Sequence, residues 1–386
     1  MYRQFAMIIV IGFAVAHSLA CAQEATWDSQ EVRSQYESFR IVRVVDGLDR
    51  PWSVAFLPDG RVLVTERPGR LNIVDGSDVT RVSGTPEVYA RGQGGLMEVS
   101  VHPEYEENGW IYLTYSKSDG SGQTATALAR GRLDGTRMVD LEDIFVQNRY
   151  SGPGRHYGSK IAWMSDGTLL MSIGDRGADP PRAQDLTDHA GTLLRLNDDG
   201  SVPADNPFVG RSDALDEIYS YGHRNIQGLV VDPLTGDIWA TEHGPRGGDE
   251  LNLIEPGKNY GWPRATLGLD YRTESEFPHS EARRIEGMVD PIYEILPTHA
   301  PSGLALVTSG RFPAWEGNLL AGGLNGERIR RLVIGKERGH YEVFHDEELL
   351  LGMIGRIREV REGPDGAIYV LTDHSNGALY RIEPLN

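Results

Sequence analysis

Residues 221–263, YGHRNIQGLVVDPLTGDIWATEHGPRGGDELNLIEPGKNYGWP, combine strand-like patterns with dense polar clusters. The middle, residues 229–241, is rich in apolar residues and is interrupted by an Asp-Pro pair and a Thr-Gly-Asp turn. This pattern predicts two antiparallel strands joined by a hairpin. Polar residues stand before the hairpin, and a glycine-rich loop follows it. We interpret the stretch as one unit of a repeat that also carries a functional site.

Five other segments share this order of an apolar run, a turn of Pro, Asp or Gly, and a second apolar run. The six segments begin at Trp52, Leu96, Lys160, Leu229, Leu304 and Ile357. Each is followed by a further strand-like piece. One such unit cannot bury both of its faces, whereas six units in a ring bury each face against a neighbour. The sequence therefore predicts an all-β fold, a six-bladed β-propeller of four-stranded antiparallel blades.

Similar turns at residues 58–60 and 364–366 predict that the first and last units meet and close the ring around a central channel. The spacing between units is uneven, and the longer gaps hold polar, glycine-rich pieces. Residues 264–299 form the longest insertion, and we expect it to lie over the site.

Composition limits the possible functions. The 386 residues include 46 Gly and 21 Pro, which favours a turn-rich β fold, and the formal charge of −18 argues against a nucleic-acid-binding surface. Residues 1–22 have a basic start, an apolar run and a small-residue end, as in an export signal peptide. We expect a flexible lead-in at residues 23–37 and a single catalytic propeller domain at residues 38–386. The protein would be exported, and periplasmic in a bacterium.

The single cysteine, Cys21, lies in this leader. Simple cleavage after Ala22 is the preferred interpretation, and lipidation of Cys21, which would tie the protein to a membrane, is the alternative. In either case the mature fold has no disulfide.

Signatures of nucleotide binding and of common hydrolases are missing, so we sought a site among the polar pieces. His156 precedes the third unit and is a candidate general base, and Asp175, at the end of the same hairpin, is placed to fix its tautomer. The alternative is a surface-loop histidine beside a structural aspartate.

Arginines gather at the start of two units. Arg224 and Asn225 precede the fourth, and Arg356 and Arg358 open the sixth at a spacing that puts both guanidinium groups on one face of a strand. Their forked donors match carboxylates, so a ligand with several carboxylates in the channel would explain them. Asp373 could contact the same ligand. Surface pairing with Glu359 and Glu362 is the alternative.

The glycine-rich loop offers oxygen ligands for a hard cation. Gly244 and Pro245 present main-chain carbonyls, Glu250 a carboxylate, and the chain returns nearby at Tyr260. Calcium fits such a set, whereas zinc would need Cys or His clusters. The alternative is a solvated acidic turn.

Together the motifs resemble the soluble quinoprotein aldose dehydrogenases of the glucose/sorbosone dehydrogenase family, exported six-bladed propellers that use pyrroloquinoline quinone (PQQ) and calcium. The resemblance covers roughly residues 45–384. The marks that carry it are GQGGLMEVSVHP, GRHYG, SIGDRG, GTLLRLNDDGSVPADNPF, SYGHRNIQG, EHGPRGGDELN, GKNYGWP, APSG, and GRIREV with GPDGAIYVLTD.

The resemblance implies a role for each candidate. His156 would remove the proton of the anomeric hydroxyl with Asp175 as its orienting partner, and Gln93 would lie at the sugar. Arg224 and Asn225 would stand beside the reactive quinone carbonyls. The implied cofactor anchors are Arg356, Arg358 and Asp373; the implied calcium ligands are Gly244 and Pro245 beneath the cofactor, and Glu250 and Tyr260 at a second, structural calcium.

Two departures from the family pattern bear on function. Asn325 stands where the family usually has a lysine that contacts the cofactor, and the segment at residues 178–186 does not follow the pattern, which leaves the substrate range open. The leading hypothesis is an aldose dehydrogenase, a monomer or homodimer, that passes electrons to an external acceptor. The alternatives are a non-catalytic propeller that binds carbohydrate or protein, and a calcium-dependent lactonase, which would not require the paired arginines.

Overall fold

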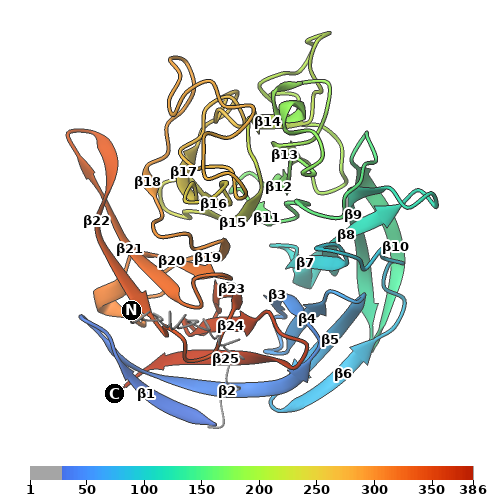
Figure 1. Cartoon of the computed structure of the whole chain (residues 1–386). Coiled ribbons are helices and arrows are strands. Elements are labelled where there is room, and N and C mark those ends of the chain that lie inside the picture. The colour runs from blue at the N-terminus through green and yellow to red at the C-terminus, as the bar shows by residue number, and fades with distance from the viewer. Residues whose placement is uncertain (1–27, 386) are drawn as a thin grey trace, which may run out of the picture.

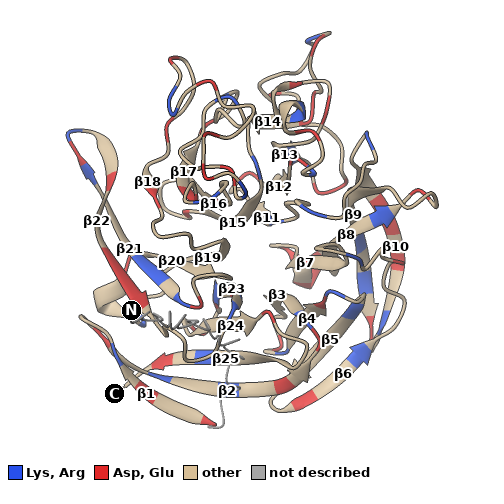
Figure 2. Cartoon of the chain, viewed as in Figure 1, with Lys and Arg blue, Asp and Glu red and all other residues tan. Residues whose placement is uncertain are grey.

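All six segments predicted as hairpins form pairs of antiparallel strands in the computed structural model, which describes residues 28–385. Each pair begins a sheet, and the sheets stand as blades around a common centre (Figure 1). The prediction of an all-β, six-bladed propeller is therefore confirmed. Acidic and basic residues are mixed along the outer strands, as Figure 2 shows for β6 and β10.

The blades follow one another in chain order, and within each blade every strand pairs with the next. Their strands are β3 (Pro51–Phe56), β4 (Val62–Glu66), β5 (Arg70–Asp75) and β6 (Asp78–Val82); β7 (Leu96–Val101), β8 (Trp110–Ser118), β9 (Thr124–Asp134) and β10 (Arg137–Val146); β11 (Ile161–Trp163), β12 (Leu169–Ile173), β13 (Thr192–Leu196) and β14 (Ile218–Tyr221); β15 (Ile226–Val231), β16 (Ile238–Glu242), β17 (Glu250–Ile254) and β18 (Tyr293–Glu294); β19 (Pro301–Leu306), β20 (Leu319–Gly323), β21 (Ile329–Glu337) and β22 (His340–Leu349); and β23 (Ile357–Glu362), β24 (Ile368–Thr372) and β25 (Gly377–Pro384).

The ring closes in the sixth blade, where β2 (Ser38–Leu48) from the start of the described chain pairs with β25 from its end (Figure 1). The predicted meeting of the two ends is thus observed. Beyond β2 lies a fifth strand, β1 (Ser29–Arg33), which pairs with it from Ser29 opposite Val42 to Arg33 opposite Ser38. The expectation of a flexible lead-in through residue 37 is wrong for this part, because the polar segment gains a strand partner. The predicted signal peptide lies outside the described residues.

Helices are short in the described part of the chain. They are the α-helix α1 (Tyr105–Asn108) and the 3₁₀ helices η1 (Pro180–Gln184) and η2 (Pro313–Trp315). Within residues 28–385 no helix is both long and apolar enough to cross a membrane.

The hydrophobic core lies between blades. Six main apolar clusters occur in the described residues, one at each contact between neighbouring blades, and β4 shows how a strand serves two of them. Leu63 packs toward the second blade, while Val62 and Val64 pack toward the sixth. Strand alternation therefore buries both faces, which is why the units need the ring.

A β-bulge stands at the start of the innermost strand in five of the six blades. The register of β3, β7, β15, β19 and β23 against its partner shifts by one residue just after the strand begins. A bulge puts two residues opposite one and re-aims a side chain. Trp52, Met97, Gln227 and Arg358 occupy the second position of their strands, at these shifts, and reach the centre of the ring.

Candidate active site

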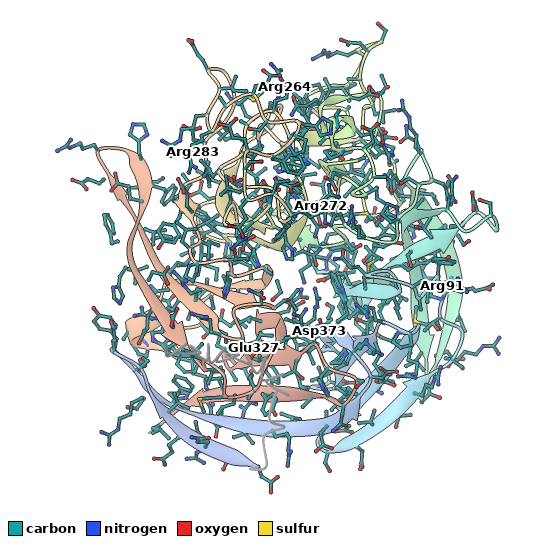
Figure 3. The ribbon with its side chains drawn as sticks, in the orientation of Figure 1. Arg91, Arg264, Arg272, Arg283, Glu327 and Asp373 are labelled. Carbon is teal, nitrogen blue, oxygen red and sulfur yellow. The ribbon has the colours of Figure 1, made fainter. Side chains whose placement is uncertain are left out.

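A cavity opens at the centre of the ring, and two sets of residues line it. One set comes from the bulges, and the other directly follows β4, β16, β20 and β24: Arg67, His243, Leu324 and Asp373. The cavity measures about 490 Å³ with its open mouth included, and its remaining walls are Gln93, Tyr157, Gly158, Asn225 and Arg356. Figure 3 shows Asp373 at the inner edge of the ring.

His156 and Asp175 meet beside this cavity. Nδ1 of His156 lies 2.6 Å from Oδ1 of Asp175, whose Oδ2 accepts a hydrogen bond of 2.8 Å from Nε1 of Trp262. In the described chain Nε2 of His156 has no hydrogen-bond partner. His156 is only 8% exposed, so it is not a surface-loop histidine. A carboxylate at Nδ1 holds the proton there and leaves the lone pair on Nε2.

Electrostatics keep this pair in the base form. Burial and the charge of Arg224 lower the pKa of His156 below its ordinary value, although Asp175 acts in the opposite direction. Burial would raise the pKa of Asp175, but the neighbouring His156 and Arg224 hold it below its ordinary value. The imidazole is therefore neutral and its partner ionised near neutral pH.

The loop that carries His156 is fixed on both sides. The main-chain N–H of His156 donates to Oε1 of Gln93 at 2.8 Å, and the N–H of Gly158 donates to Oδ1 of Asn225 at 3.0 Å. His156 has a φ of 52°, a strained value for a residue with a Cβ. Gln93 and Asn225 thus hold the base in a conformation that it would not adopt unaided.

Arg356 and Arg358 both bond to one carboxylate, that of Asp373. Arg356 and Arg358 donate to its Oδ2 at 3.2 and 3.4 Å, and Arg358 also reaches Oε1 of Gln227 at 3.1 Å. Nε of Arg358 is buried without a partner in the described chain. The alternative of pairing with Glu359 and Glu362 is wrong for both arginines, because Glu359 bonds to Lys160 and Glu362 caps Thr308.

Arg224 lies between His156 and the glycine-rich loop. Its Nη1 donates to the carbonyl of His243 at 3.1 Å, and its guanidinium lies 5.3 Å from the ring centre of Trp262. Its Nε is buried and has no partner among residues 28–385. His243 lines the cavity and is held by the carbonyl of Pro301, 2.6 Å from its Nε2.

The glycine-rich loop comes next to Arg224. The carbonyl of Gly244 receives a long bond of 3.4 Å from the hydroxyl of Tyr271, and the carbonyl of Pro245 accepts from the N–H of Gly248 at 2.9 Å. Tyr271 belongs to the insertion at residues 264–299, so the insertion reaches the glycine-rich loop. No group of three or more His, Cys, Asp or Glu in the described chain could hold a metal ion by side chains alone.

Glu250 lies away from the cavity and opposite Glu242 across β16 and β17. Nδ2 of Asn252 lies 3.3 Å from both carboxylates. Burial and the neighbouring charge of Glu242 raise the pKa of Glu250 well above its ordinary value. The phenol of Tyr260 is engaged with Leu253 and Glu255, so only its main-chain carbonyl could serve a cation.

The channel below the cavity is closed by a buried ionic cluster, which we call the axial plug and which consists of Glu98, Lys160, Glu359 and Arg361. Nζ of Lys160 lies 2.8 Å from Glu98 and 2.6 Å from Glu359, and Arg361 bonds to Glu98 at 2.5 Å. Lys160 also lies 4.9 Å from the ring centre of Trp52, which lines the cavity. The absence of a side chain at Gly303 leaves room for Glu359, since a Cβ there would lie 2.0 Å from its carboxylate.

Sequence reasoning missed Arg67, Trp52, Gln227 and Trp262 as site residues. The first three follow the positional rule described above, so aligning the six units by strand ends would have found them. Trp262 lies in a long insertion with no such rule. Asn325 is exposed and donates to the carbonyl of Thr298 at 3.3 Å, outside the cavity wall.

The propeller thus sets the buried His156–Asp175 pair beside a cavity whose arginines could hold an acidic ligand. Comparison with known proteins agrees: the model of the family "Glucose / Sorbosone dehydrogenase" matches residues 48–381. The chain belongs to this family, and the resemblance seen in its motifs is confirmed.

Individual relatives extend this result. The chain is 37% identical to aldose sugar dehydrogenase YliI of Escherichia coli over 373 residues, 95% of this chain and 97% of that protein. Its fold matches a crystal structure of glucose dehydrogenase with a TM-score of 0.84 at 41% identity, covering 88% of this chain and 98% of the other. It also matches the PQQ-bound aldose sugar dehydrogenase of Streptomyces coelicolor, with a TM-score of 0.71 at 27% identity and coverages of 92% and 98%.

Proposed function

We propose that the protein is a PQQ-dependent dehydrogenase that oxidises the C1 hemiacetal of aldose sugars to lactones and passes the electrons to an external acceptor. The observation that carries the proposal is the His156–Asp175 pair at the edge of a cavity lined by arginines. The leader at residues 1–22 supports export to the periplasm, with a membrane anchor only if Cys21 is lipidated. A monomer or a homodimer is compatible with this function.

The base has one task. Nε2 of His156 takes the proton of the anomeric hydroxyl, and Asp175 stabilises the imidazolium that forms. Gln93, whose amide oxygen already holds the main chain of His156, places its amide group beside the same sugar.

The cavity fits PQQ, an acid with three carboxylates. Arg356 and Arg358 would hold carboxylates of the cofactor, and the partnerless Nε atoms of Arg224 and Arg358 are donors that a bound anion would satisfy. Asn225 would lie at the cofactor beside Arg224. When bound, PQQ supplies the acceptor for the hydrogen that leaves C1 with its electron pair.

Calcium fits the carbonyls of Gly244 and Pro245, which directly follow His243 of the cavity wall. The first receives only the long bond from Tyr271, and the second accepts one bond and keeps a lone pair for a cation. There it would polarise the cofactor as a Lewis acid. A second calcium would relieve the repulsion between Glu242 and Glu250 and take the main-chain carbonyl of Tyr260.

The direct experiment is reconstitution. We expect the purified mature protein to reduce an artificial electron-accepting dye with aldoses only after PQQ and calcium are both added. A chelator present during reconstitution should lower that activity. A protein that neither binds PQQ nor reduces the dye would instead be the non-catalytic carbohydrate- or protein-binding propeller, and the missing lysine at Asn325 would be the reason.

The pH dependence follows from the pKa of the base. The active, neutral form of His156 exists above its pKa, which burial and Arg224 lower from 6.5, so the acid limb of kcat/KM should lie below pH 6.5. Asp175 raises this pKa, so Asp175→Asn should move the limb to still lower pH. The same change should slow kcat by about 10²–10⁴ because an amide group then faces Nδ1.

Asp179→Asn is the matched control, because this carboxylate is exposed and close in sequence. It should leave both the limb and kcat unchanged. An acid limb that stays in place in Asp175→Asn would show that Asp175 does not act through His156.

A further inference from the structure

The cavity wall carries more positive than negative charge. Arg67, Arg356 and Arg358 face it, and Asp373 is the single carboxylate in the wall. Burial would raise the pKa of Asp373, but Arg358, Arg356 and Arg67 hold it below its ordinary value. Because one carboxylate is shared among three guanidinium groups, two positive charges stay uncompensated.

Arg67 is the arginine of this set without a partner. Arg356 and Arg358 both bond to Asp373, whereas the guanidinium of Arg67 makes no hydrogen bond or ion pair with any residue between 28 and 385. Glu66, its neighbour in sequence, pairs with Arg70, and Asp49 pairs with Arg50 and Arg70. Leaving a partly buried cation unpaired is costly, so it indicates a ligand.

The position of Arg67 is fixed by its main chain. Its N–H donates to the carbonyl of Arg50 at 3.0 Å, and its own carbonyl accepts from the N–H of Leu96 at 3.1 Å. A Cβ on Gly95 would lie 1.9 Å from that carbonyl, so the chain of Arg67 packs directly against the turn at residues 92–95. The same turn presents Gln93 to His156, and therefore Arg67 and the sugar-facing residues are held together.

Other basic residues near Asn325 cannot supply this charge. Arg328 bonds to Glu348 and to the carbonyl of Gly326, and Arg330 forms two bonds to Asp346. Both side chains are directed to β22 and stand outside the cavity wall.

We propose that Arg67 is a cofactor-binding residue that takes a carboxylate of PQQ from the first blade, next to the anchors in the sixth. It supplies the positive charge that Asn325 does not bring. The inference rests on the proposed function. A forked guanidinium can bind a carboxylate by two parallel hydrogen bonds. Such a ligand explains why Arg67 has no protein partner while the other arginines of the cavity wall are paired.

The test measures binding and not turnover. PQQ is titrated into the cofactor-free mature protein with calcium present and sugar absent, and quenching of tryptophan fluorescence reports binding, since Trp52 lines the cavity. We expect Arg67→Met to raise the Kd about 10- to 100-fold, as for loss of a charged hydrogen bond. Arg67→Lys, which keeps the charge without the fork, should fall between. The trimethyl ester of PQQ, which lacks the carboxylate charges, should lose little affinity on either change.

Arg61→Met is the matched control. Arg61 pairs with Asp59 in the turn between β3 and β4 of the same blade, and its replacement removes the same net charge as Arg67→Met. Its Kd for PQQ should equal that of the wild type. Cofactor-free Arg67→Met should melt at or above the wild-type temperature, since it loses an unpaired charge.

The outcomes separate the two proposals. An unchanged Kd in Arg67→Met, or an equal loss in Arg61→Met, overturns the role of Arg67 while the proposed function stands. A wild-type protein that does not bind PQQ overturns the proposed function and the role of Arg67 together.

Discussion

Replacing His156 by alanine is expected to slow aldose oxidation by about 10²–10⁴ or more while the protein still folds and binds PQQ. The reason is the geometry of the pair: with Nδ1 committed to Asp175 at 2.6 Å, Nε2 is the atom free to take a proton. The imidazole does not bond to any of the arginines that would hold the cofactor, so its removal leaves those anchors in place.

The measurement is kcat of the reconstituted variant, with thermal melting and PQQ titration as checks of fold and loading. His340→Ala serves as the control, because His340 is exposed on the hairpin of β21 and β22. Normal turnover in a loaded His156→Ala protein would remove His156 from the mechanism.

Replacing Lys160 by methionine is expected to lower the free energy of unfolding by about 3–5 kcal/mol, or to prevent folding. Lys160 is 2% exposed and stands between two carboxylates that are themselves almost fully buried. Without it, Glu98 and Glu359 would face each other across the channel with only Arg361 to balance them.

Urea unfolding of the cofactor-free protein measures this loss. Lys117→Met is the control, because Lys117 pairs with Asp143 at the surface and such a pair contributes about 0–1 kcal/mol. Adding Glu359→Gln to Lys160→Met should recover part of the loss, since Glu98 then stays paired with Arg361 and no charge of the plug is left unpaired. An unchanged urea midpoint in Lys160→Met would contradict the importance that we assign to the plug.

The repeat pattern predicted the fold because each hairpin turn and apolar run is local information. The site was predicted where unusual residues form compact motifs, as at His156, Arg224 and Arg356. Arg67 was missed because nothing in its neighbourhood is unusual: only the end of β4 turns it toward the centre. Glu242 likewise became a partner of Glu250 only through the register of β16 and β17. Both depend on how distant strands align, which a single run of residues does not contain.

The axial plug closes one end of the central axis and leaves the cavity open at the other. A propeller with an open axis could admit sugar at one end and meet its electron acceptor at the other, so that both were present at once. Here the buried salt bridges of the plug fill the axis below the cavity, so the cavity opens on the side away from the plug. In the proposed function, sugar and electron acceptor would therefore use the same opening in turn. The lactone would leave before the acceptor binds, and a high concentration of either partner would delay the other.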